Sequence, residues 1–329
     1  MRPVYIRNHR VSRKIGSMMG GDGKNTMRKR HFNRLLRTAG TVAAFTLLIY
    51  LLSRQGWDQI LEGITAIPGW RFVAAIALML VSRLVVAARW HVLLNAVGQR
   101  MPWPESLRIT FAGLFASNFL PTTIGGDVVR LAMVLRLDYD KIIATASLAV
   151  DRLVGLAGMA TAAPLGLFPA IGTAAAWGSP TVLAAGVFTG FTGRMRGLWM
   201  RLTRALGLWM RSPRSLLLAY AWTWVHQLAL FGVVYLMLHG LGENAPFWLI
   251  GGLWSFTYFV TLLPISINGL GLQELSMTAI FTSVGGVSVA GAATAALLVR
   301  TMQMLASLPG ALFLPDILSE NRSRDGEAE

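Results

Sequence analysis

The hydrophobic positions of this chain form long runs, and the polar positions gather between them. A helix of about 20 apolar residues is long enough to cross a bilayer. Six runs are predicted to do so, near 38–52, 70–88, 142–164, 169–190, 214–239 and 287–313. Two further apolar stretches, near 105–137 and 246–285, are each interrupted by a proline. The pattern predicts an all-α polytopic membrane protein with about six full spans and two proline-broken elements.

The two interruptions have the same form. The sequences SNFLPTTIGGDVVR and VTLLPISINGLGLQE each place a proline five residues before a glycine, Pro121 before Gly126 and Pro264 before Gly269. A broken helix leaves backbone N–H and C=O groups unpaired, which a membrane tolerates only where the break is buried in protein or lines a polar cavity. Matched breaks in two halves of a chain are typical of a transporter site built from internal repeats.

The composition supports a membrane location. Apolar residues make up 54% of the 329 residues, charged residues 14%, and the mean hydropathy is +0.54, whereas a soluble fold of this length would carry more charge. The net charge of +15 resides in arginines at segment ends and in loops. Membrane topology predicts this placement, so nucleic acid is not expected as a partner. The chain has no cysteine, which excludes disulfides and thiolate metal sites.

Two basic segments are expected to contact an anionic lipid surface. Residues 1–37 form an arm with eleven Lys or Arg against one acid, Asp22, and Met27 within it is an alternative start. Residues 191–214 carry six arginines and no acid. Wound as a helix, this segment separates an apolar arc from an arginine arc, which predicts a cytoplasmic interfacial helix. An ordinary basic loop is the alternative. The membrane domain is expected to cover 38–318, and 319–329 a polar tail.

Positive charge also predicts the orientation. The N-terminus, the 89–108 connection and the 191–214 segment are expected on the cytoplasmic side of the cell (inner) membrane. Because Arg136 and Lys141 follow the first broken element, that element is expected to leave and return on this side. The second would begin and end outside. The breaks are thus predicted to be re-entrant hairpins in an inverted repeat, with full spans as the alternative.

The residues around the breaks are the candidate substrate-binding site. Gly125 and Gly126 permit a tight reversal, and a helix that begins there directs its N–H groups and its positive dipole end toward an anion. Arg130, one turn later, can bind phosphate with two hydrogen bonds. The alternative for this motif is a plain turn with Asp127 as the helix N-cap. The predicted site residues are Asn118, Pro121, Gly125, Gly126, Asp127, Arg130, Pro264, Asn268, Gly269, Gly271 and Glu274.

Ionisable residues inside the apolar segments form the second candidate group. An unpaired charge at mid-bilayer costs at least ~2.5–3.5 kcal/mol, so such residues are expected to converge in the interior. Three acids balance three arginines: Asp127, Asp151, Glu274, Arg130, Arg152 and Arg300. A purely structural ion-pair network is the alternative. Arg83 and Arg89 are expected to snorkel from a helix end, and His226 and Gln227 to hydrogen-bond between helices.

Three motifs resemble a known family. The sequences NFLPTTIGGDVVR, SLAVDRLVG and LLPISINGLGLQE, in this order, are similar to the lysylphosphatidylglycerol synthase transmembrane-region family, a flippase-like membrane domain. The similarity covers roughly residues 35–318 and implies a lipid-translocating membrane domain. About fifteen residues follow the last span, so the aminoacyltransferase domain of the full-length synthase, and its lysyl transfer, are not expected.

The motifs of common enzymes are missing from the sequence. It contains no HExxH, GxSxG or P-loop and no histidine cluster with metal-ligand spacing. No cofactor or metal is therefore predicted, and no oligomeric state. The expected function is to translocate, or present, a phospholipid or lipid-linked anionic head group between leaflets. The alternatives are a scaffold for a lipid or cell-envelope biosynthetic enzyme, and a membrane transferase with Asp127 or Glu274 as general base.

Overall fold

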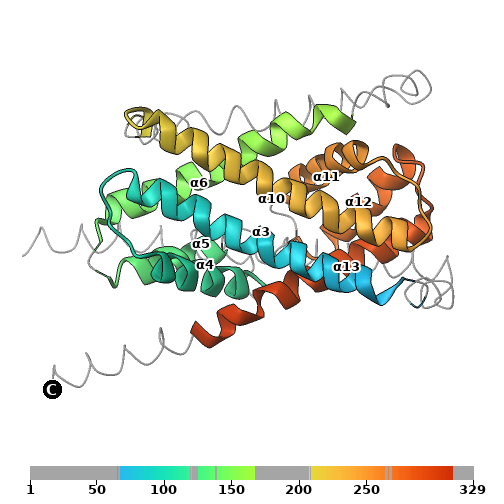
Figure 1. Ribbon diagram of the computed structural model, residues 1–329, viewed down its shortest axis with the longest axis horizontal. Coiled ribbons are helices and arrows are strands. Elements are labelled where there is room, and N and C mark those ends of the chain that lie inside the picture. The colour runs from blue at the N-terminus through green and yellow to red at the C-terminus, as the bar shows by residue number, and fades with distance from the viewer. Residues whose placement is uncertain are drawn as a thin grey trace, which may run out of the picture.

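The structure is a computed structural model that describes residues 65, 67–118, 120, 125–137, 139–166, 207, 209–263, 266 and 269–313. All regular elements within these ranges are helical (Figure 1). Some expectations concern residues outside them: the arm 1–37, the runs 38–52 and 169–190, most of 191–214, the tail 319–329, and Pro121, Pro264 and Asn268.

Four described helices are long and apolar enough to cross a membrane. They are α3 (Gly69–Asn95), α6 (Lys141–Ala162), α10 (Pro213–Gly240) and α13 (Val289–Ser307), the last continued by the 3₁₀-helix η1 (Leu308–Phe313). At 1.5 Å per residue, the 28 residues of α10 extend about 42 Å, more than the roughly 30 Å of hydrocarbon in a bilayer. Four of the six predicted spans are thereby confirmed as candidate membrane helices, and the other two lie outside the described residues.

Helices α3 and α10 form a long antiparallel pair across the bundle (Figure 1). Near the start of α3, Ile67 lies against Gly240 at the end of α10, where an added Cβ would come within 2.9 Å of the isoleucine. At the other extreme, Trp209 Nε1 donates a hydrogen bond to the Leu93 carbonyl, 2.8 Å. Small or apolar residues along both helices permit this close packing, and the pair forms a wall on which α6 and α13 pack.

Each proline-broken element is a pair of short helices. The first pair consists of α4 (Trp103–Ser117) and α5 (Gly125–Val134), and the second of α11 (Phe247–Thr261) and α12 (Leu272–Ser283). With 10 to 15 residues, these helices are about 15–22 Å long, too short to cross a bilayer individually. The helices of each pair pack on one another. The structure therefore confirms both the positions of the breaks and the helical nature of their flanks.

Glycines permit the close contacts and turns of these pairs. In the first pair, a Cβ added to Gly126 would lie 2.6 Å from the carbonyl oxygen of Gly113, so the two backbones touch. In the second pair, Gly269 and Gly271 have φ values of 72° and 76°, which lie in the left-handed region that favours glycine. Among the described residues of the second break, Gly269 and Gly271 are the glycines with a positive φ.

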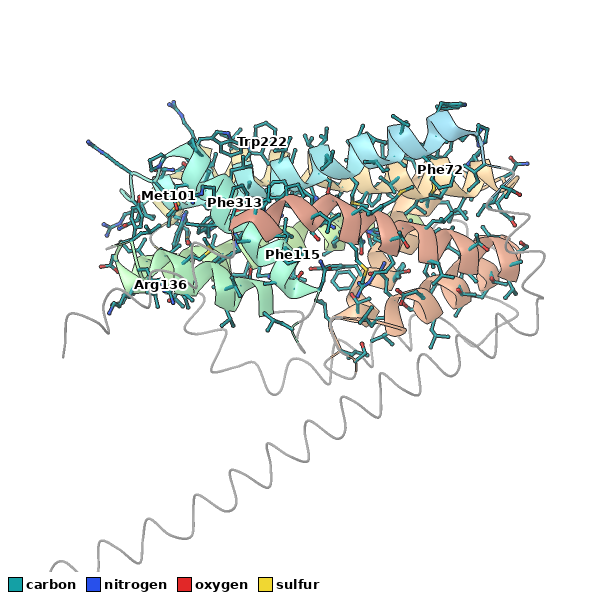
Figure 2. The ribbon with its side chains drawn as sticks, turned by 90° about the horizontal axis from the view of Figure 1, so that it is seen from below. Phe72, Met101, Phe115, Arg136, Trp222 and Phe313 are labelled. Carbon is teal, nitrogen blue, oxygen red and sulfur yellow. The ribbon has the colours of Figure 1, made fainter. Side chains whose placement is uncertain are left out.

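The two pairs open toward opposite ends of the bundle. At one end, the Asp140 backbone N–H donates to Gln99 Oε1, 3.4 Å, which joins the connections before α4 and after α5. At the other end, the Ser288 N–H donates to Glu243 Oε2, 3.2 Å, which joins the connections before α11 and after α12. Figure 2 shows Met101 and Arg136 near the first end and Phe72 near the second. We refer to these as the Gln99 end and the Glu243 end.

Candidate functional site

A cavity of about 260 Å³ lies inside the bundle. Both short-helix pairs and all four long helices contribute to its wall. Its polar and ionisable lining residues are Arg83, Arg89, Thr110, Ser117, Asn118, Asp127, Arg130, Asp151, Arg152, Thr223, His226, Gln227, Thr257, Tyr258, Thr261, Gln273, Arg300, Gln303 and Ser307. The two breaks, far apart in the sequence, thus contribute to one cavity.

Three arginines and two aspartates form the aspartate cluster on one part of the wall. Asp151 on α6 accepts a hydrogen bond from Arg89 Nε of α3, 2.7 Å, and a longer one from Arg130 Nη1 of α5, 3.4 Å. The same Arg130 nitrogen donates to Asp127 Oδ1, 3.1 Å, one helical turn away. Arg152 Nε donates to the other Asp127 oxygen, 2.5 Å. Because Asp151 and Arg152 are neighbours on a helix, they point to different partners, and the cluster joins α3, α5 and α6.

Arg130 is held in a fixed orientation with part of its hydrogen-bonding capacity unused. Its guanidinium carbon lies 4.4 Å from the centroid of the Trp90 ring, a cation–π contact. Its aliphatic stem passes directly over Gly113, where an added Cβ would come within 2.6 Å of Arg130 Cγ. Among the described residues, its Nε and Nη2 have no hydrogen-bond acceptor although they are buried. The side chain therefore retains two donor nitrogens, Nε and Nη2, that an anion in the cavity could use.

A second set of charges, the glutamate cluster, has members on α12, α13 and α3. Glu274 is 3% exposed and forms an ion pair with Arg300, with 3.8 Å between Nε and Oε1. Arg300 Nη1 also donates to Gln273 Oε1, 3.4 Å. Arg83 lies close enough to Arg300 for their positive charges to repel. No described carboxylate forms an ion pair with Arg83, and its buried Nε has no acceptor among the described residues.

The expected snorkelling of Arg83 and Arg89 is wrong. Arg89 is only 7% exposed and is bound to Asp151, and Arg83 lines the cavity. The physical reason is the length of α3, which continues to Asn95 rather than ending near 88, so neither side chain starts at a helix end. The apolar residues after Arg89, in WHVLLN, were the signal for the longer helix. The predicted balance of three acids and three arginines therefore becomes three acids and five arginines.

The other predicted site residues have different places in the structure. Asn118 lines the cavity and donates to Ser307 Oγ, 2.8 Å, which ties the end of α4 to the end of α13. Gly126 and Asp127 also line it, whereas Gly125 packs on Leu120. Gly269 and Gly271 form the turn before α12, and Glu274 meets the cavity through Arg300.

Asp127 is not a helix N-cap. It is the third residue of α5, and its carboxylate accepts from Arg130 and Arg152. An N-cap residue precedes the first helical turn and bonds the backbone N–H groups of that turn. The alternative of a plain capped turn is therefore wrong. The carboxylate instead positions two arginines at the cavity.

Interhelical hydrogen bonding is confirmed for His226 but not for Gln227. His226 Nδ1 lies 2.8 Å from Ser82 Oγ, which links α10 to α3. The Gln227 amide is buried, lines the cavity and has no hydrogen-bond partner among the described residues. Trp254 Nε1 and Gln273 Nε2 belong to cavity-lining residues and are likewise buried without a hydrogen-bond partner among the described residues. Together with the arginine nitrogens, they give the wall an excess of N–H donors, which suits a ligand rich in acceptor oxygens.

The fold and the cavity define a polytopic helical protein with a membrane location. The chain belongs to the family described as the lysylphosphatidylglycerol synthase TM region, which matches residues 37–310. The resemblance drawn from the three motifs is thereby confirmed. A comparison with curated proteins finds no match.

Proposed function

We propose that the protein moves a lipid with an anionic head group between leaflets, or presents it to one of them. The head group would enter the cavity while the acyl chains remain in hydrocarbon. The observation that carries this proposal is the shared cavity, which both short-helix pairs line and whose wall contains five arginines and two aspartates, with Glu274 behind Arg300. Ionisable groups within a membrane bundle are typical of substrate pathways because their burial is costly.

The short-helix pairs would act as re-entrant hairpins that enter from opposite faces. Helices α4 and α5 both connect at the Gln99 end, and α11 and α12 at the Glu243 end. Their lengths, too short for a full crossing, support hairpins over separate spans. With the arginine-rich connections in the cytoplasm, the first hairpin opens inward and the second outward. An inverted repeat of this kind gives the head group access from both sides.

The aspartates would keep the arginines compensated when no lipid is bound. A buried arginine without a partner is strongly destabilising, and Asp127 and Asp151 supply that partner through hydrogen bonds to Arg130. A phosphate that enters the cavity could bind the remaining Nε and Nη2 atoms of Arg130. The contacts of Arg130 with Trp90 and Gly113 would limit the conformations of the side chain before binding.

The shared cavity supports transport over the two alternatives. A transferase needs one deep pocket open to the cytosol, where a soluble donor meets the lipid. A scaffold needs no polar cavity between its helices. Neither function explains why two helix pairs that connect at opposite ends of the bundle line the same group of arginines.

The test is lipid movement in vesicles. The full chain is reconstituted into phosphatidylcholine vesicles that contain a fluorescent phosphatidylglycerol, and the fraction accessible to a membrane-impermeant quencher is followed in time. Vesicles with protein should lose the inner-leaflet signal faster than vesicles without it. Arg130→Ala should slow this loss. Arg71→Ala serves as control, because Arg71 lies on α3 against Trp70 and outside the cavity. Equal rates with and without wild-type protein would contradict the proposal.

A further inference from the structure

Arg83 gives the cavity a positive charge that no described carboxylate balances. Its side chain lines the cavity from the middle of α3, and its positive charge is close enough to that of Arg300 for the two to repel. Its Nε is buried and has no acceptor among the described residues, and no described carboxylate is paired with it. An arginine kept in a membrane interior without a counter-charge is unfavourable. A ligand that supplies the counter-charge explains its presence.

The excess charge is divided between the two clusters. In the aspartate cluster, three arginines face Asp127 and Asp151. In the glutamate cluster, Glu274 is the carboxylate among the described residues that pairs with Arg300, and Arg83 lies close to Arg300. Counted over the described residues, each cluster thus carries one positive charge beyond its carboxylates, and both border the same cavity of about 260 Å³. A ligand with one negative charge would compensate only one cluster.

The number of ester bonds on a phosphate determines whether it carries one or two negative charges. A phosphodiester, as in phosphatidylglycerol, has one negative charge and two free oxygens. A phosphate on a single ester bond carries about −1.5 to −2 at pH 7 and has three free oxygens, since its second pKa is about 6. The second charge and third oxygen would match the additional donors of the wall, which include Arg83 Nε, Gln227 Nε2 and Gln273 Nε2.

We propose that the site selects lipids whose head group ends in a terminal phosphate, and that Arg83 is the residue that provides this selectivity. This inference rests on the proposed function, because it specifies the head group bound in the same cavity. Arg130 would bind the phosphate group of any phospholipid, whether that group is a diester or a terminal phosphate. Arg83, together with Arg300, would bind the additional charge that a phosphodiester lacks.

The test compares two lipids on the purified full chain. Binding is measured at pH 8 in detergent micelles with phosphatidic acid, which ends in a phosphate, or with phosphatidylglycerol of the same acyl chains. The wild-type protein should bind phosphatidic acid about tenfold more tightly, since one more charge-assisted contact forms. Arg83→Gln should reduce this preference to within about twofold, because phosphatidic acid loses more affinity than phosphatidylglycerol when this charge is removed. Arg71→Gln, a matched change on the same helix, should keep the full preference.

A second measurement distinguishes ligand binding from a structural role. Because no described carboxylate is paired with Arg83, Arg83→Gln should accumulate normally and unfold in lipid-free detergent at a temperature no lower than the wild type. A lower unfolding temperature, or failure to fold, would assign Arg83 to the structure and overturn the proposal. Arg83→Lys, which keeps the charge, should retain part of the preference.

The remaining outcomes separate the two proposals. Equal wild-type affinity for the two lipids, or an unchanged preference in Arg83→Gln, would overturn the selectivity but leave lipid movement intact. No movement of either lipid in vesicles would overturn the proposed function itself. Competition by inorganic phosphate as strong as that by phosphatidic acid would indicate a soluble anion as ligand, and would overturn the lipid assignment.

Discussion

At the scale of single residues, Arg130 belongs both to the ion network and to the predicted binding site. Arg130→Lys keeps the charge but loses the planar fork and its stacking on Trp90. We expect normal abundance and a translocation rate reduced by about tenfold, which corresponds to roughly 1.4 kcal/mol in the barrier. Abundance and the vesicle assay together check this.

Arg152→Lys is the matched control for that variant. The Arg152 side chain is 40% exposed and donates a hydrogen bond to Asp127, so lysine can replace much of its charge. Its effect should be milder than that of Arg130→Lys. If Arg130→Lys moves lipid at the wild-type rate, the assignment of Arg130 to a phosphate is wrong and the scaffold becomes the better interpretation.

Asp151 is predicted to stabilise the fold. It accepts hydrogen bonds from Arg89 and Arg130, and its side chain is 3% exposed. Asp151→Ala leaves both arginines without this buried partner, a loss of about 3–5 kcal/mol for broken buried pairs. Protein abundance and unfolding temperature should both fall. The double variant Arg89→Leu, Asp151→Leu should recover part of the loss, whereas purely additive effects would show that the two side chains are not coupled.

At the scale of elements, the first helix pair depends on glycine contacts. A Cβ on Gly126 would lie 2.6 Å from the Gly113 carbonyl oxygen, which is backbone and cannot move aside as a side chain does. Gly126→Ala should therefore separate α4 from α5 and destabilise the protein by about 1–3 kcal/mol. Gly69→Ala is the control, since nothing lies within 4 Å of a Cβ at that position. Equal unfolding temperatures for the two variants would contradict the tight contact between α4 and α5.

The elements were largely predictable because their signals are local. Proline followed by glycine marks each break, and the predicted stretches 105–137 and 246–285 contain the two helix pairs that the structure describes. The end of α3 was not found, because Arg89 resembles a helix end in a membrane sequence. The side-chain partners were not predictable either. Arg89 and Asp151 are 62 residues apart, and only the packing of α3 on α6 brings them together.

At the scale of the whole molecule, the contacts between connections agree with the distribution of positive charge. Trp209 bonds to the end of α3, and the segment after α5 bonds to Gln99, so three arginine-bearing connections lie at the Gln99 end. The positive-inside rule had placed the same connections on one side of the membrane. The rule uses charge alone and the contacts arise from packing, so the two arguments are independent. The cavity and its excess of arginines could not be predicted from the sequence, because they arise only when the helices pack together.

The orientation in the membrane is the last prediction. The 28 residues of α10 extend about 42 Å, so segments before and after α10 should lie on opposite sides of the roughly 30 Å hydrocarbon core. Reporters inserted at Gln99 and near Gly207 should be active only as cytoplasmic fusions, because both sites adjoin arginine-rich connections. A reporter at Asn244 should show the periplasmic phenotype.

The three reporters distinguish an error in the helix geometry from an error in the orientation. Opposite results at Gln99 and near Gly207 would contradict the common Gln99 end, and with it the hairpin geometry of α4 and α5. Reversal of all three would preserve the geometry but exchange the sides, so that the first hairpin would open to the periplasm. In that case the cavity would be unchanged. The arginine-rich connections, however, could not bind the anionic surface of the cytoplasmic leaflet as predicted.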